Sequence, residues 1–551
     1  MIHNLADIEP SWDVIVIGGG ITGAGIFRES VTAGLKTVLL EQKDFSWGTS
    51  SRSSKLVHGG LRYLRDGHFL LTKASVEERE RLLQEAAGLV EPLPFLLPVY
   101  RGQSPGKHLL GAGLTIYDLI ALKKQHCYWE RDDFIQLIPA LRRNNLTGGY
   151  SFSDASVDDA RLVMRLITES VSDGGTALNY ATVTSLRKNT RGNTVGVTTR
   201  DTETGSTRDL TASVVMNATG AWAETLHPSP DAKKHIRPLR GSHLVLPSWL
   251  LPVDRAVMLI HPVDERAVFV IPWEGVVIVG TTDIDHTADL SLEPVITDKE
   301  IVYLLAVLHT FFPSYNISAD DCIATFAGVR PVLSSGNREP SHESRDHVVW
   351  ADRGLITVTG GKLTTFRLIA RDAMEAALPF LPISRLPDTD TGDLFHAVSA
   401  TETCPDVLTH DAWLRLVGRY GAGARELVSN AAVEDLTVIP GTRTLWAEIP
   451  FTATREGVRH LSDILLRRVR IGLITPEGGR IFIKRIRALL KPVLPWDTAR
   501  WDEELEAYSR LLSEAYGIPG KGITLPPRGV YYRLTSFISS IKNGFFRGTG
   551  T

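Results

Sequence analysis

The sequence predicts an α/β protein (α+β overall) in three parts: a Rossmann-like domain, an inserted β-rich domain and a C-terminal α-helical domain. Near the N-terminus an apolar run leads directly into a glycine triplet and a helical pattern. Two later apolar runs also end at glycines, Gly220 and Gly360. Beyond residue 398 the apolar positions recur at helical spacing instead. A chain of 551 residues is long enough for two or three domains.

Residues 13–42 have the order strand, glycine turn, helix and strand. The glycines of the G-x-G-x-x-G pattern are Gly18, Gly20 and Gly23. The first allows a tight turn, the second lets the backbone approach a pyrophosphate, and the third lets helix and strand pack closely. Glu41 ends the second strand, where it can accept hydrogen bonds from an adenosine ribose diol. The unit therefore predicts a dinucleotide site.

Charge and cysteine content exclude several classes of protein. The formal net charge is −3 and there is no long basic run, which argues against nucleic acid as a partner. The 3 cysteines are far apart, so we expect neither a disulfide framework nor a metal site, and a reducing compartment is favoured. The N-terminus lacks a secretory pattern, and no segment has the roughly 18 apolar residues of a spanning helix. We therefore expect a protein that is neither secreted by that route nor membrane-spanning.

A Ser- and Gly-rich connection at residues 44–64 is longer than a minimal loop, and such loops usually carry function. Residues 66–89 have a helical pattern. Residues 95–124 contain a short apolar segment with lysines at both ends. Because it is too short to cross a bilayer, it is either a core helix, which is the more common use of such a segment, or a segment that dips into a membrane surface.

The middle of the chain is predicted to alternate strands with two helices. Strands are expected between residues 176 and 218 and again between residues 236 and 285. A helix is predicted over residues 298–311. Residues 355–378 repeat the order strand, glycine turn, helix, so the helix N-terminus near Gly361 should face a polar or anionic group.

The cofactor site is predicted to close from distant segments. A nicotinamide dehydrogenase usually completes its site within one continuous half of the chain, whereas the glycine-ended strands here lie near residues 220 and 360, as in flavoproteins. Gly360 and Gly361 would let backbone N–H groups approach a flavin ring. We therefore expect an FAD-binding domain.

The expected division of the chain follows from these elements. Residues 1–90, 150–235 and 345–380 form the FAD-binding domain, residues 91–149 and 236–344 the substrate-binding and membrane-facing domain, residues 381–398 a linker, and residues 399–551 the helical domain with its tail. The clearest C-terminal helices are expected at residues 460–473 and 499–517, and their faces carry mixed charge.

Strings spread along the chain carry a resemblance to one family. They are SSRSSKLVHGGLRYL (50–64), YSFSDASVDDARLV (150–163), FVIPW with VGTTD (269–283), GVRP (328–331), SRDH (344–347) and GGKLTTFR (360–367). In these strings the chain resembles the FAD-dependent glycerol-3-phosphate dehydrogenases, the aerobic membrane-associated enzymes that pass electrons to quinone. The similarity runs from about residue 12 to residue 516. Ala221, Trp47 and the tail after Gly517 depart from the family pattern.

The resemblance implies a cofactor, a reaction and partners. The cofactor is FAD, and sn-glycerol 3-phosphate is oxidised to dihydroxyacetone phosphate by hydride transfer from C2 to N5 of FAD. Electrons would pass to ubiquinone or menaquinone, from a homodimer in the cytoplasm at the inner face of the cell membrane. Residues 95–124 and the basic stretch 533–548 both combine apolar residues with Lys or Arg, as an interfacial helix does. The resemblance favours the first of these for membrane contact.

A small dianionic substrate requires fixed cations, and arginine suits phosphate because its planar fork binds two oxygens at once. Arg62, Arg330 and Arg345 each lie in one of the strings, so we expect them to bind the substrate phosphate and hydroxyl groups. For a single loop arginine the alternative is a surface ion pair. Tyr63 and Thr282 are further candidates for hydrogen bonds to substrate, with core packing and strand capping as their alternatives.

Loss of the C2 hydroxyl proton calls for a base with a pKa near working pH, and histidine is the obvious type. His58 and His243 are the candidates, and a structural histidine is the alternative for each. Lys362 follows the second glycine turn, where its ammonium would lie beside the reduced flavin or the substrate oxygen, or form a structural salt bridge. We predict His58, Arg330 and Lys362 as the catalytic residues.

The predicted cofactor contacts come from the two glycine turns, the long connection and the strand end near residue 220. They are Gly18, Gly20, Gly23, Glu41, Thr49, Ser50, Ser51, Ser54, Lys55, His58, Gly59, Gly220, Gly361, Lys362, Leu363 and Thr364.

Other functions stay open at this point. A glycerol-3-phosphate oxidase would use O2 as acceptor. An FAD-dependent 2-hydroxy-acid or amine dehydrogenase would usually hold one carboxylate with one or two cations. The number of arginines in the site therefore distinguishes these enzymes from a glycerol-3-phosphate dehydrogenase. A flavin-binding sensor without turnover would not need the substrate motifs.

Overall fold

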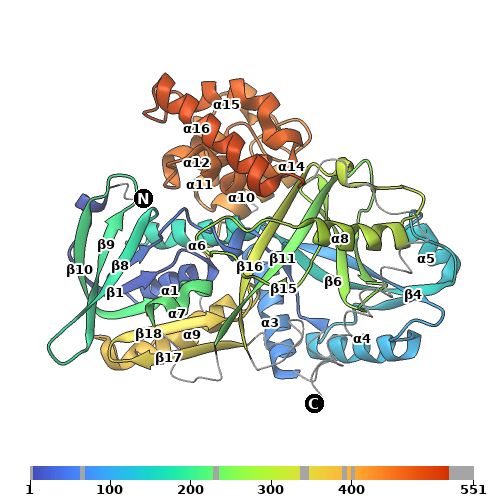
Figure 1. Ribbon diagram of the computed structural model, residues 1–551, viewed down its shortest axis with the longest axis horizontal. Coiled ribbons are helices and arrows are strands. Elements are labelled where there is room, and N and C mark those ends of the chain that lie inside the picture. The colour runs from blue at the N-terminus through green and yellow to red at the C-terminus, as the bar shows by residue number, and fades with distance from the viewer. Residues whose placement is uncertain are drawn as a thin grey trace, which may run out of the picture.

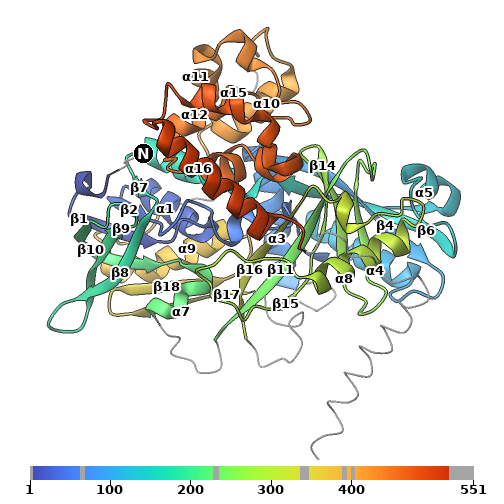
Figure 2. The ribbon, with the colours of Figure 1, turned by 45° about the horizontal axis from the view of Figure 1, so that its top comes forward.

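The computed structural model of the protein describes residues 4–61, 69–227, 235–334, 346–387, 394–398 and 404–519. Two sheets lie side by side, and the helical C-terminal domain rests above them (Figure 1). Figure 2 shows the same arrangement from a second direction.

The first sheet is the predicted Rossmann-like sheet. Its main path runs β17, β18, β10, β1, β2 and β7, and β9 joins β8 to β10. β1 is parallel to both β10 and β2. The bounds are β1 Ser11–Ile17, β2 Thr37–Leu40, β7 Thr176–Leu178, β8 Ala181–Lys188, β9 Thr194–Asp201, β10 Thr207–Asn217, β17 His347–Asp352 and β18 Leu355–Gly360. Stretches far apart in the chain thus form one sheet, which confirms the predicted fold class.

Three helices pack together on this sheet: α1 (Ile21–Thr32), α6 (Asp159–Ser172) and α9 (Phe366–Ala377). α1 contacts both α6 and α9. The approach of α9 is close because α1 has a glycine there, and a Cβ on Gly25 would lie 3.0 Å from the Phe366 ring. Buried residues of the strands and of these helices form one continuous core.

The second sheet is the predicted β-rich domain. Its main path runs β15, β11, β14, β13, β12, β4, β6 and β3, with β16 on β11 and β5 on β6. The bounds are β3 Leu56–Val57, β4 Val90–Tyr100, β5 Cys127–Glu130, β6 Leu146–Val157, β11 Ile236–Pro247, β12 Ala256–Ile260, β13 Ala267–Trp273, β14 Val276–Gly280, β15 Ile284–Asp285 and β16 Ala324–Leu333. The expected domain boundary at residue 150 falls inside β6 and needs correction, because β6 pairs with β4 as far as Val157.

Alternate residues of this sheet face two different layers. Leu244 and Leu246 of β11 pack with residues of α8 (Asp298–Phe311), whereas Val245 packs with residues of the C-terminal domain. The helix predicted at residues 298–311 is confirmed as α8, and a capping box between Thr297 and Glu300 starts it.

The predicted helix 66–89 and the apolar segment 95–124 each contribute one helix to a packed pair. α3 (Phe69–Glu85) occupies the part of the predicted helix 66–89 that is described. The apolar segment 95–124 divides into the end of β4 and α4 (Lys107–Ala121), and α4 packs against α3. Within the described ranges no helix is long and apolar enough to cross a membrane.

The C-terminal domain is helical, as predicted. It contains α10 His410–Tyr420, α11 Gly423–Asn430, α12 Glu448–Arg455, α15 Ile483–Leu490 and α16 Thr498–Leu511. The single helix predicted at residues 460–473 is wrong, because a π-helical turn separates α13 (Leu461–Asp463) from α14 (Ile471–Ile474) and Arg470 has a φ of 63°. The interruption lets Arg467, Arg468 and Arg470 all reach buried carboxylates.

The expected linker, residues 381–398, is described except for residues 388–393. Its Leu394 and Phe395 are buried in the core of the first domain, so this part of the linker is packed. The basic stretch 533–548 lies outside the described residues.

Candidate active site

A cavity of about 1470 Å³ lies between the two sheets. Segments of both domains line it: the turn after β1, the connection 47–60, the end of β16, the turn after β18, and residues of α4. One end is formed by glycines, the middle by charged side chains and the far end by apolar side chains.

The glycine end has the geometry that the sequence predicts for a pyrophosphate site. Gly18 has a φ of +109°, and a Cβ there would lie 2.6 Å from the carbonyl oxygen of Ala218. A Cβ on Gly23 would lie 1.8 Å from the carbonyl oxygen of Gly18, so the third glycine is required for packing. Gly20 is the N-cap of α1 and lines the cavity. The N-terminus of α1 can therefore face an anion in the cavity.

Glu41 lines the cavity beside this turn and is held by the backbone. Its carboxylate accepts hydrogen bonds from the backbone N–H groups of Gly19 at 2.6 Å and Lys43 at 2.9 Å. Burial raises the pKa of Glu41, while the two backbone hydrogen bonds oppose that shift. The carboxylate is thus fixed where a ribose diol could donate to it.

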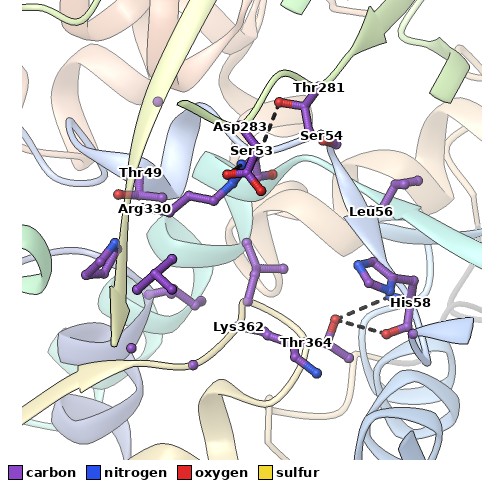
Figure 3. A pocket seen from close by; sticks show the side chains of 18 of the residues that line it. Thr49, Ser53, Ser54, Leu56, His58, Thr281, Asp283, Arg330, Lys362 and Thr364 are labelled. Atoms are coloured by element: carbon purple, nitrogen blue, oxygen red, sulfur yellow. Dashed lines mark hydrogen bonds and ion pairs between the residues drawn. The ribbon is translucent and has the colours of Figure 1, made fainter. Parts of the chain in front are cut away.

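The connection after β2 is attached to both glycine turns and to the second sheet. Ser50 Oγ accepts a hydrogen bond from Ile21 N at the start of α1 (2.9 Å), and Thr49 Oγ1 donates to the carbonyl oxygen of Val329. Further along, Thr364 Oγ1 accepts a hydrogen bond from His58 N at 3.3 Å (Figure 3). These contacts bring the predicted cofactor segments around one cavity.

Most of the predicted cofactor residues line the cavity. They are Gly18, Gly20, Glu41, Thr49, Ser50, Ser54, His58, Gly220, Gly361, Lys362, Leu363 and Thr364. Gly23, Ser51, Lys55 and Gly59 lie behind this lining. The expectation for Lys55 needs correction, because its buried ammonium forms an ion pair with Asp159 and donates to the carbonyl oxygen of Ser51 instead.

The turn after β18 presents backbone to the cavity, as expected. Gly360 and Gly361 have φ values of +80° and +75°, and a Cβ on Gly361 would lie 2.3 Å from the side chain of Ile369. Lys362 follows them and lines the cavity. With the glycine end and Glu41, this turn forms a continuous surface suited to an extended dinucleotide. The expectation that the Gly361 N–H faces a flavin ring needs correction, because it donates to the carbonyl oxygen of Asp346 at 3.1 Å.

Arg330 and Arg266 share one carboxylate in the middle of the cavity. Asp283 lies 3.2 Å from a guanidinium nitrogen of each arginine, and Arg330 also donates to Thr281 Oγ1 at 2.9 Å. Figure 3 shows Arg330 beside Thr281 and Asp283, with Lys362, Thr364 and His58 in the lower half of the view. A Cβ on Gly241 would lie 2.3 Å from the Arg330 guanidinium, so the glycine provides its space. The site thus contains cations suited to a dianionic ligand.

Arg266 was not predicted from the sequence. It follows Asp264 and Glu265 directly, and such a mixed-charge run is typical of a solvated turn. Its position immediately before β13, whose residues line the same cavity, is the signal that could have identified it.

The two candidate histidines lie in different places. His58 lines the cavity, whereas His243 is fully buried with its Nε2 2.8 Å from Ser54 Oγ and its ring stacked on Phe326. Burial lowers the pKa of His243 well below the ordinary value, and the Arg330 and Lys55 cations add to that shift. Among the described residues, His243 reaches the cavity lining through its hydrogen bond with Ser54, and His58 is the histidine of the two that lines the cavity, where it can act as base.

Thr282 faces away from the cavity. Its hydroxyl donates to Glu300 at 2.7 Å and accepts from Ser242 N at 2.9 Å, so the expectation of substrate contact is corrected to a structural contact beside Arg330. Arg62, Tyr63 and Arg345 lie outside the described residues.

The far end of the cavity is apolar and reaches the helix pair α3 and α4. The side chains there include Phe69, Leu109, Leu110, Ile116, Met258 and Phe269. Phe69, Leu109 and Ile116 are also exposed, at 54%, 68% and 39%. The cavity therefore connects its charged centre with an apolar surface.

Comparison with known proteins agrees with this geometry. Residues 13–371 match the model of the FAD-dependent oxidoreductases, and residues 390–501 match the C-terminal domain of alpha-glycerophosphate oxidase. Glycerol-3-phosphate dehydrogenase 2 of Mycobacterium tuberculosis is 34% identical, over 90% of this chain and 87% of that protein. The mitochondrial glycerol-3-phosphate dehydrogenase of Homo sapiens is 30% identical, over 97% of this chain and 78% of that protein.

A solved structure extends the match to three dimensions. The glycerol-3-phosphate dehydrogenase of Bacillus halodurans, determined with FAD bound, has a TM-score of 0.73 and 26% identity, covering 92% of this chain and 95% of that one. The sequence matches cover both the FAD domain and the C-terminal helical domain. The chain therefore belongs to the glycerol-3-phosphate dehydrogenase family of FAD-dependent oxidoreductases.

Proposed function

We propose that the protein oxidises sn-glycerol 3-phosphate to dihydroxyacetone phosphate. The observation that carries this proposal is the pair Arg330 and Arg266 around Asp283, in the same cavity as the dinucleotide turn. Guanidinium groups bind the oxygens of a phosphate dianion bidentately, so this pair suits the phosphate of that substrate. The family names of the relatives support the same substrate.

FAD, when bound, supplies the two-electron acceptor that takes the C2 hydride. The residues that would hold it are those of the glycine end, Glu41 and the Gly360–Gly361 turn. The backbone of both turns is open to a ligand because glycines lie there, with Gly18, Gly360 and Gly361 at positive φ. The other steps depend on the charged residues in the middle of the cavity.

Each charged residue has a proposed role toward the substrate. Arg330 binds the phosphate, and Asp283 holds its guanidinium in place through the hydrogen bond at 3.2 Å. His58 accepts the proton of the C2 hydroxyl as the hydride leaves, and Lys362 stabilises the negative charge that develops on that oxygen. Arg62, Tyr63 and Arg345 stay in the proposal as further substrate contacts.

The electron acceptor is proposed to be a membrane quinone. Leu119 in the last turn of α4 and Leu122, its C-cap, are 69% and 91% exposed. Ile116, which lines the cavity, precedes Leu119 by one helical turn. Lys107 and Lys123 flank this apolar surface, as in a helix that lies in a membrane interface. A lipid-soluble acceptor could thus approach the apolar end of the cavity from a bilayer. We place this surface at the inner face of the cell membrane, in a homodimer, as the family resemblance implies.

A charge placed in the apolar surface should slow electron transfer to quinone without slowing reduction of the flavin by substrate. Leu119→Glu with Leu122→Glu should weaken sedimentation with vesicles and slow reduction of a long-chain quinone, because neither side chain lines the cavity but both would enter the interface. Flavin reduction by substrate should be unchanged. Ile481→Glu, at an 82% exposed site in the C-terminal domain, is the matched control. Undiminished vesicle binding in the double variant would remove α4 as the anchor.

Turnover with defined substrates and acceptors tests the function itself. The purified protein with FAD should convert sn-glycerol 3-phosphate to dihydroxyacetone phosphate with a quinone analogue, and should not turn over glycerol, lactate or simple amines. Faster turnover with O2 than with quinone would favour the oxidase reaction instead. Turnover of lactate or an amine, with none of sn-glycerol 3-phosphate, would overturn the proposal. Light scattering would test the homodimer.

A further inference from the structure

A second, smaller hollow lies at the far end of the second sheet, well away from the glycine turns. Its volume is about 380 Å³, and it is lined by Arg101, Arg131, Arg143, Asn144, Asn145, Leu146 and Thr147. We call these residues the arginine hollow. Its three arginines come from three separate segments: the turn after β4, the start of α5 (Arg131–Leu137) and the turn before β6.

The arginines of the hollow have little carboxylate compensation. Among the described residues no carboxylate pairs with Arg101 or Arg143, and the lining contains no acidic side chain. Arg131 pairs with Asp132 at 2.9 Å, but that carboxylate is 87% exposed and outside the lining. An exposed ion pair of this kind is weak. The hollow therefore holds an excess of positive charge.

The backbone that carries these arginines is held firmly. Arg101 N donates to the carbonyl oxygen of Asn145 at 2.8 Å, and Leu146 N donates to the carbonyl oxygen of Arg143. Asn145 has a φ of 61°, a conformation that asparagine tolerates better than most residues. Tyr100 OH donates to the carbonyl oxygen of Arg142. The backbone positions of the arginines are therefore fixed before a ligand binds, and what remains to be ordered is their exposed side chains.

We propose that the arginine hollow binds a phosphate group. Guanidinium groups recognise phosphate oxygens in bidentate fashion, and the side-chain amides of Asn144 and Asn145 add neutral hydrogen-bond donors. Figure 1 and Figure 2 both show α5, which carries Arg131, on the other side of β4 from α4. Glu130, the N-cap of α5 next to Arg131, nevertheless forms an ion pair with Lys107 at the start of α4 (3.4 Å), so the hollow lies close to one end of the surface that we assign to the bilayer. A soluble phosphate and a lipid headgroup share this chemistry, and the experiment below separates them.

The hollow and the proposed active site share two strands. Phe95 and Leu97 of β4 line the large cavity, and Arg101 follows the same strand. Gln103, two positions after Arg101, also lines the large cavity, so the two sites are adjacent. Phosphate binding in the hollow therefore has to be measured apart from phosphate binding at Arg330.

Equilibrium dialysis with labelled inorganic phosphate, at low ionic strength, tests the proposal on the FAD-loaded protein. The background is Arg330→Met, which disables the phosphate contact proposed for the active site. In that background Arg101→Ala with Arg143→Ala should weaken phosphate binding on the order of 100-fold, since a charge-assisted hydrogen bond contributes roughly tenfold for each arginine. Arg101→Lys with Arg143→Lys keeps the charge but loses the fork, and should give an intermediate affinity.

The control removes two exposed arginines elsewhere, Arg187→Ala with Arg443→Ala, and should leave phosphate binding unchanged. Equal loss in this control would attribute the effect to net charge and overturn the site. Phosphate binding that is unaffected by loss of Arg101 and Arg143 would also overturn it. If Arg101→Ala with Arg143→Ala loses phosphate binding but keeps its sedimentation with phosphatidic acid vesicles, the ligand is a soluble phosphate, whereas loss of both assigns a lipid headgroup. The proposal does not depend on turnover, so failure of the proposed reaction would leave these outcomes readable.

Discussion

The junction beneath the C-terminal domain and the cavity between the sheets both gather charged side chains, but only the junction buries them fully. Asp44 forms ion pairs with Arg467 and Arg468, and none of the three side chains is more than 3% exposed. In the cavity Arg330 and Arg266 retain 21% and 23% exposure around Asp283. The same chemical pair thus occurs in two settings.

The difference teaches how to separate structural charges from charges available to a ligand. A buried ion pair that loses one partner leaves an uncompensated charge in a low dielectric, so its loss destabilises the fold. A partly exposed pair at a cavity can exchange water for a ligand at little cost to the fold. Substitutions should therefore affect stability at the junction and activity in the cavity.

The largest effect is expected at the junction. Asp44→Asn should lower the free energy of unfolding by about 3–5 kcal/mol, because Arg467 and Arg468 would remain buried without their carboxylate. Denaturant unfolding would measure it. The control is Glu91→Gln, whose exposed pair with Arg443 should contribute less than about 1 kcal/mol. Equal losses in the two variants would break the comparison.

Acid unfolding should also detect the stabilisation that the Asp44 carboxylate provides. Burial favours the neutral acid, but the charges of Arg468 and Arg467 outweigh it and lower the pKa of Asp44 to about 2. Its stabilisation is therefore complete above the ordinary pKa of 3.8 and is lost as the pH falls toward 2. The acid unfolding curve of Asp44→Asn should lack this component. An unchanged dependence on pH between 4 and about 2 would contradict the assignment.

A substitution in the cavity should lower activity and leave stability almost unchanged. Arg330→Met should lower kcat/KM on the order of 10²–10³-fold, as loss of one charge-stabilising donor does, with the thermal midpoint almost unchanged. Steady-state kinetics and thermal unfolding of the same preparation would compare the two. Arg443→Met, an exposed arginine far from the cavity, serves as the activity control. A destabilised but active Arg330→Met protein would place Arg330 with the junction arginines.

Glu41 should have an intermediate effect, confined to the cofactor. Glu41→Gln replaces one acceptor oxygen by an NH2 group that would oppose the backbone N–H of Gly19 or Lys43. We expect FAD affinity to fall roughly tenfold, the cost of one charge-assisted hydrogen bond. Quenching of FAD fluorescence on binding would measure it, with Glu9→Gln at an exposed ion pair as control. Unaltered affinity would argue against a contact with the ribose.

The smallest effect is expected at His460, where the first domain meets α16. Burial lowers its pKa, but the carboxylates of Glu203 and Glu504 outweigh burial and raise the pKa to about 10. The stabilisation is therefore complete below the ordinary pKa of 6.5 and is lost as the pH rises through about 10. Because the side chain is 32% exposed, we expect only about 1 kcal/mol. The thermal midpoint of His460→Gln should depend less on pH between pH 7 and pH 10 than that of the unsubstituted protein. An equally strong dependence on pH would contradict the role of His460.

The comparison also explains what the sequence could predict. The glycine turns, Glu41 and the helix 298–311 depend on local patterns, and all are found where they were expected. Whether the charged side chains of residues 460–473 are buried or solvated depends on partners that are distant in the sequence. Arg468, for example, pairs with Asp44 across 424 positions. A helical pattern with mixed charge suggests a solvated face, whereas here it forms the buried junction. Arg266 was missed for the same reason, because its place in the site depends on its ion pair with Asp283, which it shares with Arg330.

The most direct measurement is the visible spectrum of the purified protein, recorded without oxygen before and after addition of sn-glycerol 3-phosphate. The account predicts that the bound flavin bleaches rapidly with this substrate, stays oxidised with glycerol or lactate, and bleaches far more slowly in Arg330→Met. A flavin that stays oxidised with sn-glycerol 3-phosphate would keep the fold and the cofactor, and would contradict the function proposed for the cavity.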